Sequence, residues 1–395
     1  MNELPFCLYP WYHQLIKTDG SASPCCAFND SFLPTINYKD YFNSDWNKSL
    51  QEIMLSDNIH DGCKLCYETE QSGGFSNRHE SFSDFYLFNN IDIESEFIEK
   101  NKKVILKNII SSPKILSQEV DLSNICNLKC RMCDSSRSSK WIQDEKALNR
   151  YTHRLRESNW ELQNPESIKL LRFLGGEPFM HQPLIITELR KVESLGRLKE
   201  LSLHFNSNMT QTIDNELFDI FKQCKSVSIN ASLDGFGNLN DYIRSDSEWS
   251  TIVNNIKILD DFTEKHIKNF YWMPINTVTV YNANKLDELY GWLLSRWPKH
   301  GIPTPAVLAV EPKEMSIVNL PDKVKEKLTD RYHNFSKKNR MEKHWNALAS
   351  YLEFDRTLSE EEFLERFWHT TNILDARRNT KFSDVNPEMA EWLKI

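Results

Sequence analysis

The chain contains 395 residues, of which 40% are hydrophobic and 26% are charged, so it is long enough for two or three domains with ordinary cores. Its formal net charge is −8, which disfavours binding to nucleic acid through bulk charge. Residues 1–20 have no basic segment followed by an apolar core, and no apolar run reaches the about 18–20 residues that a membrane-spanning helix needs. We therefore expect a cytoplasmic chain with no membrane partner, whose nine cysteines are metal ligands or buried thiols rather than disulfides.

The N-terminal residues 1–84 are rich in aromatic side chains, turn residues and cysteines. The stretch between Cys7 and Cys25 is typical of a hairpin that turns at Asp19-Gly20, and a helix is expected near residues 44–55. These features predict a small β-rich module. Residues 85–115 are expected to connect it to the next domain.

Short apolar runs alternate with helical patterns over residues 116–315. The expected strands are 117–123, 168–174, 200–206, 226–233, 269–281 and 305–312. This alternation predicts a parallel sheet with right-handed crossovers, and six strands are too few for a complete eight-stranded barrel. The fold class is therefore α/β, a partial (β/α)6 barrel, and the charged residues 316–395 predict a helical C-terminal appendage.

The segment "CNLKCRMC" follows the first expected strand of this barrel and places Cys126, Cys130 and Cys133 on one loop. Thiolates are the usual ligands of iron–sulfur clusters, and three of them leave one corner of a four-iron cube open. An open corner is a place for a small molecule. A zinc site is the alternative, but zinc normally needs a fourth Cys or His, and no histidine lies near this loop in the sequence.

Three further motifs fall at the ends of expected strands, where (β/α) barrels carry their chemistry. Gly175 and Gly176 permit close approach of the backbone to a ligand, and Glu177 offers an acceptor for an ammonium group, although an ordinary strand-to-helix turn has the same residues. Asn208 is a candidate sugar contact or a turn-capping residue. Ser232 is a candidate cofactor contact. Nearby Asp234 either orients substrate or caps a helix, and a solvated surface side chain is expected for Arg244.

A second cysteine set lies in the N-terminal region and includes Cys7, Cys25 and the pair Cys63 and Cys66. Four thiolates close every corner of a four-iron cube, but a pair of cysteines with two residues between them is equally typical of a zinc ribbon. The residues alone leave a cluster and zinc open. Cys26 and Cys224 are expected to be buried thiols outside both sets.

Together, the loop of Cys126, Cys130 and Cys133 and the strand-end motifs resemble the radical S-adenosylmethionine (radical SAM) superfamily over about 200 residues. The resemblance implies that the loop binds a [4Fe-4S] cluster whose open iron binds S-adenosylmethionine (SAM). It also implies reductive cleavage of SAM to a 5′-deoxyadenosyl radical, which removes hydrogen from a substrate. The remaining cofactor contacts would be Gly175, Gly176, Glu177, Asn208 and Ser232. Met209 departs from the glycine that the superfamily has after Asn208, which puts the turn geometry there in question.

The N-terminal set is similar to the auxiliary-cluster region of the twitch and SPASM radical enzymes, although that region usually follows the barrel. This likeness implies a second [4Fe-4S] cluster on Cys7, Cys25, Cys63 and Cys66, with Cys25 preferred to Cys26 because of the hairpin spacing. It also implies an external electron donor such as flavodoxin or ferredoxin. The expected substrate is a peptide or protein. The alternatives are a small-molecule radical dehydrogenase and a noncatalytic iron–sulfur electron carrier.

Overall fold

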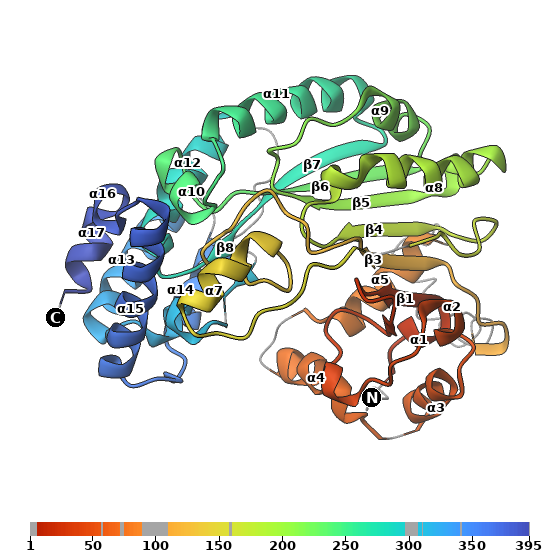
Figure 1. Ribbon diagram of the computed structural model, residues 1–395, viewed down its shortest axis with the longest axis horizontal. Coiled ribbons are helices and arrows are strands. Elements are labelled where there is room, and N and C mark those ends of the chain that lie inside the picture. The colour runs from red at the N-terminus through yellow and green to blue at the C-terminus, as the bar shows by residue number, and fades with distance from the viewer. Residues whose placement is uncertain are drawn as a thin grey trace. The chain divides into compact units, whose positions relative to one another are not determined.

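The computed structural model of the chain is drawn in Figure 1. It describes residues 6–56, 58–71, 75–88, 110–157, 160–296, 307–309, 311–339 and 342–394. The chain forms two compact units. The first unit consists of Met1–Ser123, Arg156–Phe205 and Asp214–Val227, and the second consists of Asn124–Leu155, Asn206–Ile213 and Ser228–Ile395.

The longest sheet has the strand order β2-β1-β3-β4-β5-β6-β7. Its strands are β1 (His13–Ile16), β2 (Ala22–Ser23), β3 (Ser117–Asp121), β4 (Leu170–Leu174), β5 (Ser202–Ser207), β6 (Ser226–Ser232) and β7 (Phe270–Ile275). The pairs β1–β3, β3–β4 and β4–β5 are parallel, whereas β2 runs antiparallel to β1. This mixed α/β architecture agrees with the predicted partial barrel.

Five of the six expected barrel strands enter this sheet. The fifth expected strand divides at Asn276 into β7 and the short β8 (Thr277–Val278), which pairs with β9 (Val307–Leu308) in a separate sheet. The expected strand 305–312 is thus reduced to β9, and residues 305, 306 and 310 lie outside the described residues. The hairpin of β1 and β2 forms as expected. Strand β1 also pairs in parallel with β3 and so extends the barrel sheet, and all four of its residues are buried, as is typical of parallel strands.

Helices are more common in the N-terminal region than the sequence suggested. The described elements are α1 (Tyr9–Tyr12), α2 (Tyr38–Tyr41), α3 (Asp45–Met54), α4 (Lys64–Gln71) and α5 (Asn77–Phe88). Helix α3 lies where it was expected. Ser44 caps it by accepting a hydrogen bond from the backbone of Asn47, and Asn47, Leu50 and Met54 form its buried stripe. The expectation of a β-rich module is therefore wrong for the residues described, and the expected connector 85–115 begins inside α5, with residues 89–109 outside the described residues.

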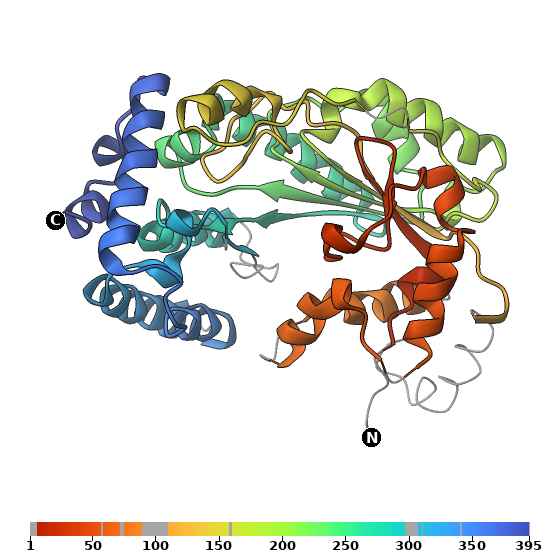
Figure 2. The ribbon, with the colours of Figure 1, turned by 60° about the horizontal axis from the view of Figure 1, so that its bottom comes forward.

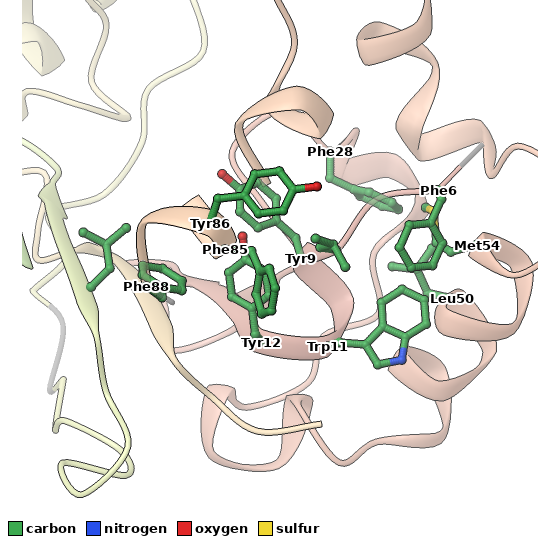
Figure 3. Packing of buried hydrophobic residues seen from close by; sticks show 12 residues of the cluster. Phe6, Tyr9, Trp11, Tyr12, Phe28, Leu50, Met54, Phe85, Tyr86 and Phe88 are labelled. Carbon is green, nitrogen blue, oxygen red and sulfur yellow. The ribbon is translucent and has the colours of Figure 1, made fainter. Parts of the chain in front are cut away.

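An aromatic cluster forms the core of the N-terminal region, as Figure 3 shows. Phe6, Tyr9, Trp11 and Tyr12 from the first residues pack with Phe28, with α3 and with three aromatic side chains of α5. Cys7, Cys25 and Cys63 are partly buried against this cluster. The core therefore fixes the segments that carry three of the four N-terminal cysteines.

The remaining helices belong to both units and include the C-terminal region. The first unit contains α8 (Gln182–Ser194) and α9 (Asn215–Phe221). The second contains α7 (Ile142–Ala147), α10 (Asn238–Ile243), α11 (Trp249–His266), α12 (Leu286–Arg296), α13 (Asp322–Asn339), α14 (Glu342–Tyr351), α15 (Glu360–Arg378), α16 (Phe382–Val385) and α17 (Pro387–Trp392). The helical C-terminal region is confirmed, and Figure 2 shows its helices in blue. Among the described residues, no helix is both long and apolar enough to cross a membrane.

Candidate cluster and cofactor site

The loop after β3 carries Cys126, Cys130 and Cys133, all of them partly buried. Two side-chain donors approach its sulfur atoms. Asn208 Nδ2 lies 3.8 Å from Cys126 Sγ, and Arg244 Nη1 lies 3.8 Å from Cys130 Sγ. The backbone N–H of Leu128 also donates to Cys126 Sγ at 3.4 Å. Hydrogen bonds to sulfur stabilise thiolates and tune the potentials of iron–sulfur clusters, so this environment suits such a group.

Burial raises the pKa of the Cys130 thiol, and the nearby Arg244 guanidinium opposes that rise. Burial also raises the pKa of Cys133, with a further contribution from Cys130. Neighbouring thiolates repel one another, so a positively charged metal group is needed to hold them all ionised. Among the described residues, no three His, Cys, Asp or Glu side chains are close enough to bind one metal ion.

Arg244 is buried, contrary to the expectation of a solvated surface residue. Its Nε lies 2.8 Å from Asp234 Oδ2, and both side chains are at least nine-tenths buried. Asp234 also accepts a hydrogen bond from the backbone of Thr277 at 2.7 Å. The expected helix cap is absent, because α10 begins after Gly237, with no side-chain cap. Asp234 therefore positions Arg244 beside Cys130. Ser232 is the last residue of β6, two residues before Asp234 in the sequence, and it is partly buried.

Asn208 is buried and forms a turn at the end of β5. Its Oδ1 accepts hydrogen bonds from the backbone and the hydroxyl of Thr210, and its Nδ2 donates to Asn127 Oδ1 at 3.0 Å. The turn-capping role is therefore present, and the amide also reaches Cys126. Met209 has a φ of 59°, the left-handed conformation that glycine would adopt. Such a φ costs a non-glycine residue about 1–2 kcal/mol, which the full burial of Met209 and the bond from Asn255 to its carbonyl offset.

The Gly175-Gly176-Glu177 segment follows β4 in the first unit. Gly175 has a φ of 104°, and a Cβ on it would lie 2.7 Å from the carbonyl oxygen of Ser123. Gly176 donates to that same carbonyl at 2.7 Å. Gly175 is thus needed where this turn approaches the backbone of Ser123. Glu177 is 1% exposed, and its carboxylate accepts a hydrogen bond from the backbone of Phe179 at the start of the following helical turn.

The four N-terminal cysteines, Cys7, Cys25, Cys63 and Cys66, line one pocket of the first unit. Tyr67 and Arg78 line it too. Burial raises the pKa of Cys7 to about 11 and that of Cys63 to about 12, and repulsion from Cys66 adds to both shifts. Segments up to 59 residues apart, from Cys7 to Cys66, are therefore brought together around a space with the donor set of a thiolate-bound metal group.

Cys26 is exposed, so the expectation that it is buried is wrong. Its sulfur accepts a hydrogen bond from Asn77 Nδ2 at 3.1 Å. The Cys26 thiol is also hydrogen-bonded to the carboxyl group of Glu119. It does not line the cysteine pocket. Cys224 is buried, as expected.

Sequence reasoning underrated two charged side chains of this site. Arg244 lies ten residues after Asp234, but nothing in that spacing shows that the two side chains pair. Arg131 stands inside the cysteine loop and is 1% exposed, a placement that its residue type does not favour. Only the fold shows which partners compensate these buried charges.

Residues 120–290 match the sequence profile of the Radical SAM superfamily. These residues therefore form a radical SAM superfamily domain. Such a domain implies a [4Fe-4S] cluster and SAM as its cofactors. A search of curated proteins found none that matches this sequence.

Three solved structures are similar to a part of this chain. Native anSMEcpe with bound AdoMet and the Cp18Cys peptide is 18% identical, with a TM-score of 0.37, over 57% of this chain and 62% of that chain. SuiB of Streptococcus suis bound to S-adenosylmethionine is 16% identical, with a TM-score of 0.36, over 64% of this chain and 53% of that chain. SuiB bound to the precursor peptide SuiA is 14% identical, with a TM-score of 0.35, over 73% of this chain and 63% of that chain. The chain thus matches less than two thirds of the length of each of these proteins.

Proposed function

We propose that this protein is a radical SAM enzyme that abstracts hydrogen from a peptide or protein substrate. The observation that carries the proposal is the loop of Cys126, Cys130 and Cys133 inside the superfamily domain, with N–H donors directed at two of its sulfur atoms. A noncatalytic electron carrier needs no additional strand-end motifs of the kind found here. The substrate class follows from the resemblance to the twitch and SPASM enzymes.

Cys126, Cys130 and Cys133 would hold the cluster that binds SAM. A reduced cluster held there would supply the electron for reductive cleavage of SAM. Arg244 and Asn208 donate toward the ligand sulfur atoms and would stabilise them as thiolates. Gly175, Gly176, Glu177, Asn208 and Ser232 remain the proposed SAM contacts. The absence of a Cβ at Gly175 permits the tight turn that presents the buried Glu177.

Cys7, Cys25, Cys63 and Cys66 would hold a second cluster. Their common pocket supports this assignment, as does the position of Cys26 outside it. The second cluster would bind the substrate or accept an electron from it.

Anaerobic reconstitution followed by iron and sulfide analysis tests the metal content, which should approach about eight of each for two cubes. The reduced protein should then convert SAM to 5′-deoxyadenosine, and mass spectrometry of candidate peptides should detect a product changed by loss of hydrogen or by a new bond. A protein that carries clusters but leaves SAM intact would be an electron carrier. Stoichiometric zinc in the N-terminal set would remove the second cluster from the proposal. If small molecules but no peptides are oxidised, the substrate assignment is wrong.

A further inference from the structure

The cluster loop is held by a buried arginine of its own. Arg131 lies between Cys130 and Cys133, and its side chain is fully buried. Its Nε donates to the carbonyl of Tyr242 at 3.1 Å, and its guanidinium carbon lies 3.6 Å from the centre of the Tyr242 ring. Its backbone N–H donates to the carbonyl of Ile243 at 2.8 Å. A buried guanidinium needs a counter-charge, and none of these partners supplies one.

The counter-charge comes from the end of α15, 244 residues further along the chain. Asp375 Oδ1 lies 2.6 Å from Arg131 Nη2, and Thr380 Oγ1 accepts from the same nitrogen at 2.8 Å. Asp375 also accepts from the hydroxyl of Thr380 and from the backbone of Phe382. These bonds fix the carboxylate, so the ion pair joins two structured segments.

A second contact links the same end of α15 to Cys130. Arg378 lies 4.8 Å above the ring of Trp141, whose Nε1 donates to the carbonyl of Cys130 at 2.8 Å. Arg378 also donates to Ser245 Oγ at 2.9 Å, and the carbonyl of Ser245 accepts from the backbone of Lys129. The Arg378 guanidinium is thus linked to Cys130 through Trp141 and to Lys129 through Ser245.

Arg378 is held in place by Asp144 of α7. Its Nη2 lies 2.9 Å from Asp144 Oδ2, and Arg377 binds Asp144 Oδ1 at 2.6 Å. The two arginines differ in environment, because the Arg378 side chain is 2% exposed and that of Arg377 is 38% exposed. Helices α7 and α15 are in contact.

We propose that the segment from Asp375 to Thr380 is a working part of the cluster site: it holds the cysteine loop through Arg131 and keeps a buried positive charge close to Cys130. This inference rests on the proposed cluster at Cys126, Cys130 and Cys133. It makes Arg131, Asp375 and Arg378 positioning residues, which act through the loop. The C-terminal helical region is then required for the redox properties of the cluster and not only for stability.

The charge at Arg378 is tested by the midpoint potential of the loop cluster in the full-length protein. A positive charge stabilises the reduced, more negative cluster, so Arg378→Gln should shift the potential to a more negative value. Arg378→Lys keeps the charge and should restore most of the shift. Arg377→Gln is the matched control, because it removes an exposed arginine bound to the same Asp144 and should leave the potential unchanged. Of the protein's cluster signals, the relevant one is that absent from Cys130→Ala.

The anchoring role of Asp375 is tested by the rate at which a chelator removes iron from the reconstituted protein. Asp375→Asn leaves the Arg131 charge without a counter-charge, so the loop should open more often and lose iron several-fold faster. Glu362→Gln on the same helix removes an exposed partner of Arg366 and should leave the rate unchanged.

The outcomes of these experiments distinguish a failure of the proposed function from a failure of the charge role or of the anchoring role. A wild-type protein with no cluster that depends on Cys130 would overturn the proposed function. A normal wild-type cluster whose potential is the same in Arg378→Gln and Arg378→Lys would overturn the charge role. Equal iron loss from the wild type and Asp375→Asn would overturn the anchoring role. If Arg378→Gln fails to fold, Arg378→Lys alone decides the charge role. A midpoint potential equal to that of the wild type supports this role, and a clearly more negative potential contradicts it.

Discussion

Cys126, Cys130 and Cys133 lie on one loop of eight residues, whereas Cys7, Cys25, Cys63 and Cys66 come from separated segments of the first 66 residues. The loop thiols meet polar donors from Asn208 and Arg244. The N-terminal thiols instead pack against an aromatic core and line a pocket. A local set can be assembled by a few hydrogen bonds, while a dispersed set depends on the packing of the whole region around it. The two sets should therefore fail in different ways when they are perturbed.

The largest expected effect follows from removing a loop thiol. Cys130→Ala leaves two of three ligands and removes the sulfur atom nearest Arg244, so SAM cleavage should be abolished. The measurement is 5′-deoxyadenosine formed by the reduced protein. Cys224→Ala is the control, since this buried thiol lies outside both sets and its loss should affect stability alone. Undiminished cleavage by Cys130→Ala would show that the loop is not the site of the reaction.

Removal of Cys63 and Cys66 together should separate the two sets. We expect the variant to retain SAM cleavage that is uncoupled from product, because the loop and its donors are unchanged, and to form no substrate product. About four iron atoms should remain per chain, as one cube requires. Metal binding and folding are coupled in small sites, so circular dichroism must show that the N-terminal region is intact. Full product formation by a folded variant with one cluster would make the N-terminal set structural only.

The same contrast explains what the sequence could predict. The spacing of Cys126, Cys130 and Cys133 is a local pattern, and the strands around it are short apolar runs whose type is visible without the fold. The parallel pairing of β1 with β3 was missed, because a four-residue strand inside an aromatic segment has no periodicity that names its partner. The buried Arg244 and Arg131 were missed for a related reason: their partners, Asp234 and Asp375, are known only once the chain is folded.

A smaller effect is expected from Gly62→Ala, which should disturb the N-terminal cysteine set through packing alone. A Cβ at Gly62 would lie 2.2 Å from Cζ of Phe28, a buried ring of the aromatic core, directly beside Cys63. Gly62→Ala should destabilise the protein by about 1–3 kcal/mol through overpacking and lower the iron content of the N-terminal set. The loop cluster should remain. Gly291→Ala is the control, because nothing lies near that helical position and alanine should stabilise α12 by roughly 0.5–1 kcal/mol. Equal melting of the two variants would contradict the packing argument.

A pH-dependent effect on stability is expected at Glu119, the buried carboxyl group that is hydrogen-bonded to Cys26 outside the cysteine pocket. Burial raises its pKa from 4.5 to about 7, while Arg172 opposes the shift. Because the folded-state pKa is the higher one, the folded protein is favoured while Glu119 is protonated, and that advantage is lost as the pH rises from about 4.5 to about 7.

Glu119→Gln cannot ionise, so the variant should become more stable relative to the wild type across this pH range, by about 1–3 kcal/mol at pH 8. Denaturant unfolding of the metal-free protein at several pH values measures the difference. Glu361→Gln, at an exposed position in the first turn of α15, should give a curve parallel to that of the wild type. A parallel curve for Glu119→Gln as well would mean that Arg172 keeps this carboxyl group ionised in the folded protein. Cys26 would then lie beside a permanent negative charge, which would further disfavour its thiolate form. This would be a further reason why Cys26 does not join the four cysteines of the pocket as a metal ligand.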